Sequence, residues 1–422
     1  MQKKKVLMLA YQFPPMGGAG VQRTLKFAKY LPQFGWEPII YTVDHKKGVN
    51  DPTLIGEVNH VRIIRTKSHD LTHWKKPFHI LGKFLSRKLL IPDGEWLWYR
   101  KNRRSILEYV KEIQPDVIYS TSYPYSDHLL GLYVKKHYKD IPWVVDFRDE
   151  WTKNPYILDM NYSNYRKKTE QKMEADVIAH CDYFITNSPF MLEGFMEDYD
   201  LKDKSIVIPN GYDVSDFEGL EINSTKREKL TITYAGSMYG RRKPDYFLKA
   251  LNKAIEEKSV DEKDILLQFV GDFSKQNIEK ISRMLGNKNI VKFYSYMEHK
   301  KSIEFLLNSD VLLLIVGKGI GDKNFYTGKI FEYINTQKTI LALVPEEGAA
   351  AMVIKETKTG YVIDSTEVDK IATCIGDIYS RWKQGTLEVQ PDYEAISQYD
   401  RVNLTKQLSV VLDGVLRDDR LL

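Results

Sequence analysis

The stretch VLMLAYQFPPMGGAGVQRTLKFAKYL, residues 6–31, predicts a strand, a glycine-rich loop and a helix in direct succession. Residues 6–11 are apolar without a break, as is typical of a strand buried on both faces of a parallel sheet. After the loop, apolar side chains recur every three or four positions, at Val21, Leu25, Ala28 and Leu31. This unit indicates the start of a doubly wound α/β domain.

The same alternation continues along the chain and then starts again after a polar break. In the first half, further strands are predicted at 39–43, 61–65, 116–120, 143–147, 183–186 and 206–208. In the second half, strands are predicted at 230–235, 265–270, 291–294, 311–316, 339–344 and 360–363. Because helical patterns separate these strands, we predict an α/β protein with two doubly wound, Rossmann-like domains that face a cleft.

The predicted boundaries divide the 422 residues into four parts. Residues 1–217 form an N-terminal domain, 218–229 a polar linker and 230–390 a C-terminal domain. Residues 393–422 are amphipathic and helical, with no strand after them, so 391–422 form a separate C-terminal segment. Two domains suit this length, since a domain usually has about 100–200 residues.

Composition indicates a folded protein of a reducing compartment. Apolar residues make up 43% of the chain and charged residues 28%. No apolar run approaches the ~20 residues of a membrane-spanning helix, and the N-terminus lacks the apolar stretch of a secretory signal. Since Cys181 and Cys374 make no disulfide framework, we expect a cytoplasmic protein.

Positive charge is concentrated in residues 67–104. Ten Lys and Arg but only three Asp and Glu fall there, for a segment charge of +7 against +5 for the whole chain. Three tryptophans, Trp74, Trp96 and Trp98, lie among them. This mixture suits an anionic interface, either lipid headgroups or nucleic acid, or else an ordinary basic helix face with inward aromatic rings.

The glycine loop at residues 17–20 precedes a helix, where backbone N–H groups can bind a phosphate. A dinucleotide fingerprint needs G-x-G-x-x-G, but Arg23 stands at the third glycine position. Asp44 does resemble the ribose-binding acid of that fingerprint. NAD binding is therefore kept as a minor alternative, beside a plain tight turn.

Polar residues also follow two later strands of the first half. Asp146, Arg148 and Asp149 come at the end of strand 143–147, where they can recognise a polar substrate or form an internal ion pair. His128 follows strand 116–120 at the start of a helix. A lone histidine is more often structural than catalytic, so the residue alone decides nothing.

In the second half, Gly236 and Ser237 follow a strand, and the cations of 241–243 open the next helix. Cations at a helix N-terminus can hold a diphosphate, or they can form a solvated turn. Residues 327–329 start another helix, with Glu332 one turn in. That carboxylate can accept hydrogen bonds from ribose hydroxyls or simply favour the helix N-terminus.

We expect no metal site. Asp198 and Asp200 form a D-x-D pair, but in a polar loop after a helix. His69 and His73 have metal-like spacing without a third ligand nearby.

Together these segments resemble one family. The chain carries IPWVVDFRDEW, IPNGYDVSDF, ITYAGSMYGRRKPDYFLKAL and FYTGKIFEYINTQKTILALV in this order. This combination resembles the GT-B glycosyltransferases of family 4, which are retaining, metal-independent and dependent on a nucleotide sugar. The resemblance implies that the C-terminal helix crosses back onto the first domain.

The resemblance also implies roles for particular residues. Those implied to act in catalysis, near the transferred sugar and the leaving diphosphate, are His128, Arg242 and Lys243. Those implied to bind the donor are Gly18, Ser237, Arg241, Asn324, Thr327, Gly328, Lys329 and Glu332. Those implied to face the acceptor or the cleft are Asp146, Arg148 and Asp149.

Two positions depart from the family pattern. Asn324 stands where the family has the first Glu of E-x7-E, and Ser237 where it has an Arg. The second change shifts neutralisation of the phosphates onto 241–243. No carboxylate nucleophile is identifiable, so a front-face transfer is expected, in which the leaving diphosphate takes the acceptor's proton.

The resemblance thus implies transfer of a sugar, from a UDP-sugar in the first instance, to a glycan or lipid-linked acceptor in cell-surface polysaccharide synthesis. No cofactor, metal or nucleic acid is expected, and residues 67–104 are expected to rest on the cytoplasmic leaflet. The alternatives are a nucleotide-sugar epimerase of the same fold, an NAD-dependent two-domain enzyme, or a non-enzymatic module that binds lipid or RNA.

Overall fold

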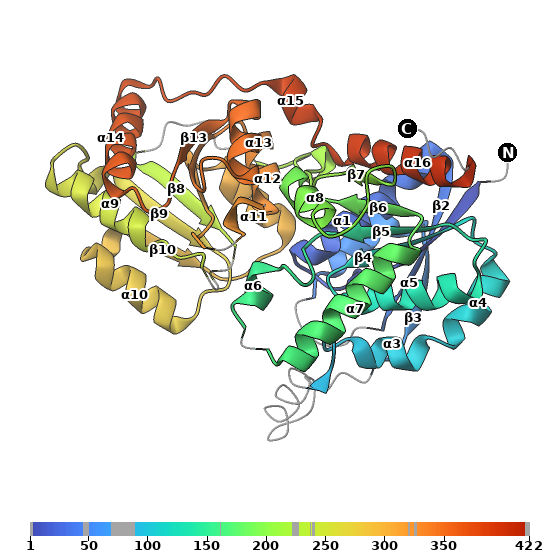
Figure 1. The fold of residues 1–422 in the computed structure, drawn as a ribbon. Helices are drawn as coiled ribbons and strands as arrows, with labels where there is room; N and C mark the ends of the chain where they lie inside the picture. The colour runs from blue at the N-terminus through green and yellow to red at the C-terminus, as the bar shows by residue number, and fades with distance from the viewer. Residues whose placement is uncertain are drawn as a thin grey trace. The chain divides into compact units, whose positions relative to one another are not determined.

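The computed structural model describes residues 3–44, 50–68, 89–160, 162–221, 228–236, 238, 241–319, 321–324 and 327–417, without the side chains of 155 and 156. The chain forms two compact units (Figure 1). Unit 1 contains Met1–Asn210 together with Arg401–Leu422, and unit 2 contains Gly211–Asp400.

Among the described residues, unit 1 has a parallel sheet of seven strands in the order β3-β2-β1-β4-β5-β6-β7. The strands are β1 (Lys4–Leu9), β2 (Trp36–Val43), β3 (Arg62–Thr66), β4 (Val117–Ser122), β5 (Trp143–Phe147), β6 (Tyr183–Thr186) and β7 (Ser205–Val207). Val6 of β1 pairs with Pro38 on one side and Val117 on the other, so the direction of strand addition reverses at β1. In open α/β sheets, ligands bind beyond the carboxyl ends of the strands at such a reversal.

Helices cover both faces of this sheet. They are α1 (Ala19–Tyr30), α3 (Trp96–Asn102), α4 (Ser105–Ile113), α5 (Ser126–His137), α6 (Pro155–Leu158), α7 (Asn164–His180), α8 (Pro189–Met196) and α16 (Arg401–Arg417). Side chains of β1 alternate between two cores: Leu7 and Leu9 belong to one, Val6 and Met8 to the other. Since successive strand residues point to opposite faces, the unbroken apolar run of β1 fills both cores.

The C-terminal helix α16 completes the second of these cores. Leu404, Leu408, Val411 and Leu412 recur at helical spacing, are buried, and lie in one core with Val21 and Leu25 of α1. Residues 393–422 were predicted as one helical stretch, but a short helix, α15 (Tyr393–Ser397), precedes α16. The chain turns between them, where the N–H of Tyr212 donates to the carbonyl of Tyr399 at 3.1 Å.

Unit 2 repeats the doubly wound plan. Within its described residues, six parallel strands lie in the order β10-β9-β8-β11-β12-β13. They are β8 (Leu230–Ala235), β9 (Ile265–Val270), β10 (Val291–Tyr294), β11 (Val311–Ile315), β12 (Thr339–Leu343) and β13 (Gly360–Ile363). The longer helices are α9 (Asp245–Glu256), α10 (Lys275–Leu285), α11 (His299–Leu307), α12 (Lys329–Asn335), α13 (Ala349–Thr357) and α14 (Val368–Gln384). The reversal in this sheet falls at β8, which lies between β9 and β11.

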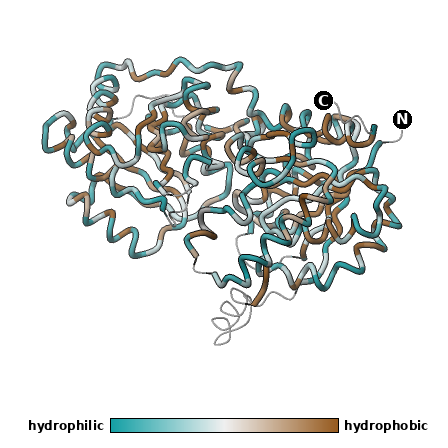
Figure 2. The backbone as a smooth tube through the Cα atoms, in the orientation of Figure 1, coloured by the Kyte–Doolittle hydropathy of each residue, from teal (hydrophilic) through white to brown (hydrophobic). Residues whose placement is uncertain are grey.

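The predicted α/β class with two doubly wound sheets is therefore confirmed. In each unit, hydrophobic segments concentrate inside and hydrophilic segments on the outer helices and loops (Figure 2). Across the residues that the structure describes, no helix combines the length and the apolar character needed to span a membrane.

Candidate active site

In unit 2, two glycines let the ends of neighbouring strands approach closely. Gly236 follows β8 with φ +107°, and Gly271 follows β9 with φ +145°. A Cβ on Gly271 would lie 2.9 Å from the backbone of Gly236, and one on Gly236 would lie 2.3 Å from Cε of Lys329. The glycine predicted after this strand therefore makes room for the Lys329 side chain.

Lys329 is the first residue of α12, and its ammonium lies over the Tyr234 ring, 3.9 Å from the centroid. No described residue accepts a hydrogen bond from this ammonium. Burial, followed by the nearby charge of Arg242, lowers the pKa of Lys329 well below its ordinary value, although Glu332 opposes the shift. A bound anion would reverse that shift, so the arrangement favours a negatively charged ligand.

The three predicted cations of 241–243 lie in different surroundings. Arg242 is buried and acts electrostatically on Lys329, whereas Lys243 is exposed. The Arg241 guanidinium packs against Gly319, where a Cβ would lie 2.3 Å from Nη1. Arg242 is thus the member of this cluster that the structure associates with Lys329.

The other predicted donor residues lie around the start of α12. Thr327 is buried, and its Oγ1 has no hydrogen-bond partner among the described residues. Gly328 is exposed at the N-cap of α12, which has no side-chain cap. Asn324 ends a short 3-10 helix, Asp322–Asn324, and Ser237 lies outside the described residues.

Glu332, one turn into α12, has a partner that the sequence did not indicate. Its Oε1 lies 2.8 Å from Nε2 of His299, the first residue of α11. The other ring nitrogen of His299 lies 3.7 Å from Oδ2 of Asp216.

In unit 1, Gly18 is the exposed N-cap of α1, with φ +98° and no side-chain cap. A positive φ suits glycine, and the first backbone N–H groups of a helix have no acceptor in a preceding turn. In α1, the N–H of Val21 donates to the carbonyl of Gly18 at 3.2 Å. The loop geometry is thus compatible with the predicted approach of a phosphate.

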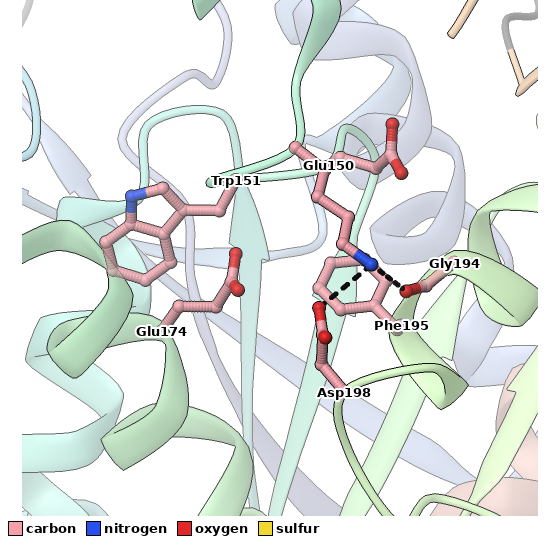
Figure 3. Close-up of a pocket in the computed structure, with 7 residues that line it drawn as sticks. Glu150, Trp151, Glu174, Gly194, Phe195 and Asp198 are labelled. Carbon is pink, nitrogen blue, oxygen red and sulfur yellow. Dashed lines mark hydrogen bonds and ion pairs between the residues drawn. The ribbon is translucent and has the colours of Figure 1, made fainter. Parts of the chain in front are cut away.

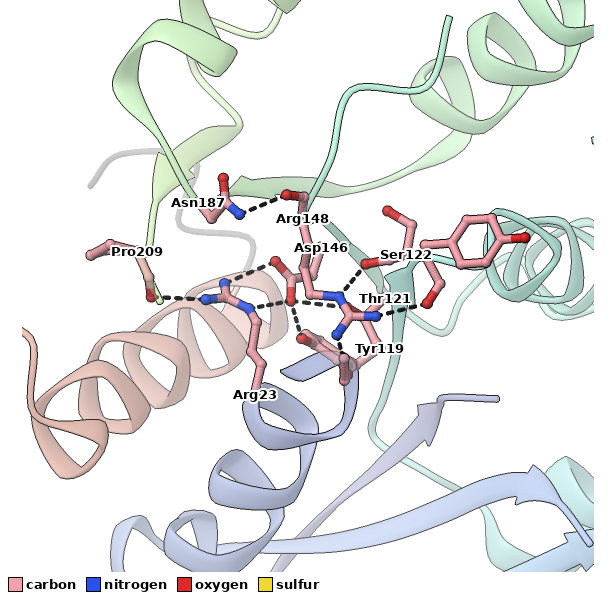
Figure 4. A network of polar contacts seen from close by, with 10 residues as sticks. Arg23, Tyr119, Thr121, Ser122, Asp146, Arg148, Asn187 and Pro209 are labelled. Atoms are coloured by element: carbon pink, nitrogen blue, oxygen red, sulfur yellow. Dashed lines mark hydrogen bonds and ion pairs between the residues drawn. The ribbon is translucent and has the colours of Figure 1, made fainter. Parts of the chain in front are cut away.

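Asp146 forms an internal ion pair, with Arg23 rather than with its neighbour Arg148 (Figure 4). Arg23 donates through Nε at 2.7 Å and Nη2 at 2.9 Å, and both side chains are buried. Burial opposes ionisation of Asp146, but the charge and hydrogen bonds of Arg23, together with the Tyr119 hydroxyl, lower its pKa. Arg23, which stands where the dinucleotide fingerprint has its third glycine, therefore pairs with the buried Asp146 from helix α1.

Arg148 links two loops by hydrogen bonds at the carboxyl ends of the strands. Its guanidinium donates to the carbonyls of Gly20, Ser122 and Tyr123, and its own carbonyl accepts from Asn187 at 2.6 Å. The glycine loop is thereby joined to the connection between β4 and α5 (Figure 4). Asp149, next along the chain, is half-buried.

His128 is fully buried in the first turn of α5. Its Nδ1 lies 2.8 Å from the hydroxyl of Ser120, which also accepts from Trp143 at 2.9 Å, and its ring stacks on Phe147 at 4.3 Å. Burial lowers its pKa to about 3, so the imidazole is neutral near pH 7. Its Nε2 is buried as well and has no hydrogen-bond partner among the described residues.

A separate pocket of unit 1 is lined by charged and aromatic side chains (Figure 3). Its lining is Glu150, Trp151, Lys153, Glu174, Gly194, Phe195 and Asp198. The ammonium of Lys153 donates to the carbonyl of Gly194 at 2.8 Å and pairs with Asp198 at 2.8 Å. Asp198, from the D-x-D pair, is therefore paired with a lysine.

Two doubly wound units in one chain, the second with cations beyond the carboxyl ends of its strands, have the architecture of the GT-B fold. Residues 16–216 match the family described as Glycosyltransferase Family 4, and residues 218–386 match Glycosyl transferases group 1. The chain therefore belongs to the GT-B glycosyltransferases of family 4 type and is a glycosyltransferase. No curated protein sequence matches it.

Solved structures share the fold at low sequence identity. Sucrose-phosphate synthase from Thermosynechococcus elongatus is 13% identical with a TM-score of 0.69, over 99% of this chain and 100% of that one. Anabaena Alr3699/HepE in complex with UDP and glucose is 14% identical with a TM-score of 0.65, over 97% and 100%. WaaG, a glycosyltransferase involved in lipopolysaccharide biosynthesis, is 15% identical with a TM-score of 0.60, over 97% and 100%.

Proposed function

We propose that this enzyme transfers a sugar, with retention of configuration, from a nucleotide-diphosphate sugar to a glycan or lipid-linked acceptor in cell-surface polysaccharide synthesis. The observation that carries the donor class is the pair of cations Lys329 and Arg242 beside the N-terminus of α12. The fold relative Alr3699/HepE, described with UDP and glucose, favours a UDP-sugar as the first donor to test.

In this proposal the diphosphate is bound by charge in unit 2. Lys329 and Arg242 supply the positive charge, and the backbone at Thr327 and Gly328 supplies N–H groups. Glu332 accepts hydrogen bonds from the ribose hydroxyls. The family resemblance also implies roles for Gly18, at the phosphates, and for His128, near the transferred sugar.

The same cations stabilise the leaving group during transfer. As the glycosidic bond to the donor breaks, negative charge grows on the diphosphate, and fixed cations lower the barrier without a metal. The acceptor oxygen bonds to the anomeric carbon on the face that the diphosphate leaves, and an oxygen of the departing diphosphate takes the proton of that acceptor hydroxyl. Attack on this face retains the configuration. No metal is required in this proposal.

A second part of the proposal concerns the basic segment 67–104, of which 67, 68 and 89–104 are described. Leu89 is 67% exposed, and Arg100 lies over the half-buried Trp96 ring at 5.2 Å. Trp98, in contrast, is fully buried and donates to Thr66 at 2.8 Å. We propose that the exposed basic and apolar groups of this segment contact an anionic membrane surface on the cytoplasmic side.

The donor class is tested by thermal-shift measurements against UDP, GDP, ADP, CMP and NAD, and against their sugar conjugates, with magnesium and with EDTA. A ligand at 100 times its dissociation constant stabilises a protein by about 2.7 kcal/mol. Stabilisation by one nucleoside diphosphate, equal in both buffers, is expected. Stabilisation by NAD alone, or by no nucleotide, would contradict the proposal.

Turnover is then followed with the donor so identified. Product analysis with an acceptor separates transfer with retention from inversion, and loss of the donor sugar's configuration without any acceptor would instead identify an epimerase. For the surface, vesicles with anionic lipid are expected to bind the protein and to release it as salt is raised. Vesicle binding that depends on neither lipid charge nor salt would contradict the proposed contact with an anionic membrane.

A further inference from the structure

Unit 2 contains a histidine between two carboxylates. His299 begins α11, Glu332 lies in the first turn of α12, and Asp216 ends a 3-10 helix, Val214–Asp216. Nε2 of His299 lies 2.8 Å from Oε1 of Glu332, and Nδ1 lies 3.7 Å from Oδ2 of Asp216. Three elements far apart in sequence thus meet at one imidazole.

The spacing assigns different roles to the two contacts. A distance of 2.8 Å is that of a strong hydrogen bond, so Nε2 carries a proton and donates it to Glu332. At 3.7 Å, Asp216 acts on the ring by charge.

This contact restricts Glu332 without using all of its acceptor capacity. A carboxylate has about four lone-pair sites, of which His299 takes one on Oε1. The side chain of Glu332 remains 25% exposed, so its second oxygen is accessible to a ligand. Restricting a flexible glutamate before binding removes part of the entropy cost of ordering it later.

Glu332 also lies where a fixed side-chain orientation would help to bind a nucleotide. It lies one turn from Lys329, the cation beside the proposed diphosphate site, in the same short helix. A ribose joined to that diphosphate presents two neighbouring hydroxyl donors, and both must meet one carboxylate in a fixed orientation.

We propose that His299 is a positioning residue that fixes the Glu332 carboxylate to accept hydrogen bonds from the ribose hydroxyls of the donor nucleotide. The inference rests on the proposed function, because it takes the ligand of unit 2 to be a nucleoside diphosphate. His299 itself need not touch the ligand.

The test compares a ribonucleotide with its deoxy analogues. Dissociation constants are measured by calorimetry for whichever of UDP, GDP and ADP binds most tightly, and for its 2′-deoxy and 3′-deoxy forms. The proteins are the wild type, His299→Ala, His299→Gln, Glu332→Gln and the double variant His299→Ala/Glu332→Gln. His180→Ala is the matched control, since His180 is an exposed histidine 3.1 Å from Asp176 in unit 1.

We expect the wild type to prefer the ribonucleotide over a deoxy form by about tenfold or more, as befits hydrogen bonds to a charged group. His299→Ala is expected to reduce that preference at least threefold while leaving deoxynucleotide affinity nearly unchanged. His299→Gln, which keeps an N–H donor, is expected to restore part of the preference, and His180→Ala to leave it as in the wild type. In the Glu332→Gln background, His299→Ala is expected to have little further effect.

Two results would overturn the inference in distinguishable ways. If the wild type binds none of the three diphosphates, the proposed function and this inference fail together. If the wild type binds one with a clear ribose preference, and His299→Ala keeps that preference or weakens all three ligands equally, only the role of His299 is refuted. Thermal denaturation of each variant shows whether a uniform loss reflects unfolding.

Discussion

Lys329 has an unusual electrostatic position for a lysine. Its ammonium lies on the ring of Tyr234, beside the buried Arg242, with Glu332 as the compensating charge. A charge held in this way costs free energy in the empty protein, since burial and a like charge both disfavour ionisation. Binding of a diphosphate would offset that cost.

This arrangement predicts that nucleotide affinity depends on pH. Because the pKa of Lys329 is lowered in the free protein, a rising pH removes its proton first from the unliganded state. Diphosphate binding must then take up a proton, so we expect affinity to fall as pH rises through the range in which the free protein loses that proton. Lys329→Met should weaken binding at least tenfold, about 1.4 kcal/mol, and flatten this dependence.

Calorimetry of UDP between pH 7 and 10 in buffers of different ionisation enthalpy measures both the affinity and the proton uptake. If nucleotide affinity depends on pH in the same way in Lys329→Met, the proton taken up on binding belongs to another group.

A second prediction at the residue scale concerns Gly236. An added Cβ meets Lys329 at 2.3 Å, and a positive φ disfavours every residue with a side chain. We expect Gly236→Ala to lower stability by about 1–3 kcal/mol and to weaken nucleotide binding, because Lys329 must move.

Gly286→Ala is the matched control in the same unit. Gly286 also has a positive φ, +72°, but nothing lies within 4 Å of its added Cβ. Denaturant titration should show a loss of stability in both variants, whereas nucleotide affinity should fall only in Gly236→Ala. Equal affinity losses would mean that backbone strain, and not contact with Lys329, is responsible.

At the scale of elements, the turn before α9 separates cations that are adjacent in sequence. Arg242 is buried near Lys329, while Lys243 is exposed. Charge acts more strongly in a buried site than in water, so the two residues should differ in their effect on the leaving diphosphate.

We expect neutralising both Arg242 and Lys243 to lower turnover at least tenfold, about 1.4 kcal/mol of transition-state stabilisation. Of the single variants, Arg242→Gln should account for most of that loss and Lys243→Gln for little. Steady-state kinetics with the identified donor measures each variant. Unchanged turnover in the double variant would show that neither residue stabilises the leaving diphosphate. A larger loss in Lys243→Gln than in Arg242→Gln would show that Lys243 is the more important cation.

At the scale of the whole molecule, the chain returns to unit 1 at its end. Helix α16 adds four buried apolar side chains to the core beneath α1, and Asp413 accepts from the indole of Trp36 at 3.1 Å. The core of unit 1 is therefore complete only when residues 401–417 are in place.

We predict that Leu408→Ala destabilises unit 1 by about 2–5 kcal/mol, the usual cost of a cavity at a fully buried leucine. Leu416→Ala, on the same helix but 36% exposed, should cost much less. Chemical denaturation followed by tryptophan fluorescence compares the two, and similar losses would show that the packing of α16 is not what stabilises the unit.

Much of the architecture could be predicted from local patterns. The strands at 143–147, 183–186 and 265–270 are observed with the predicted bounds, because burial within a parallel sheet makes each strand a short, mostly apolar run. The turn between α15 and α16 was missed, since it depends on a bond to Tyr212, nearly 190 positions away.

The sequence predicted several residues of the candidate site, but it did not predict which side chains contact them. Sequence indicated that Lys329 and Glu332 begin a helix near the donor, and the structure describes that helix. Sequence did not indicate Arg23 as the partner of Asp146, 123 positions apart, or His299 as the partner of Glu332, 33 positions apart. The sequence offered no sign of either pair.

By itself, then, the sequence determined the α/β class and the two doubly wound halves, because apolar periodicity is a local property of the chain. The class of enzyme followed from the resemblance of its motifs, in their order along the chain, to one family. Only the tertiary structure decided which charges meet: Asp146 with Arg23, Lys329 beside Arg242, and Glu332 with His299. The physical reason is that strand order, and not sequence distance, determines which carboxyl ends lie side by side, and the charge and burial of each neighbour then decide which groups ionise.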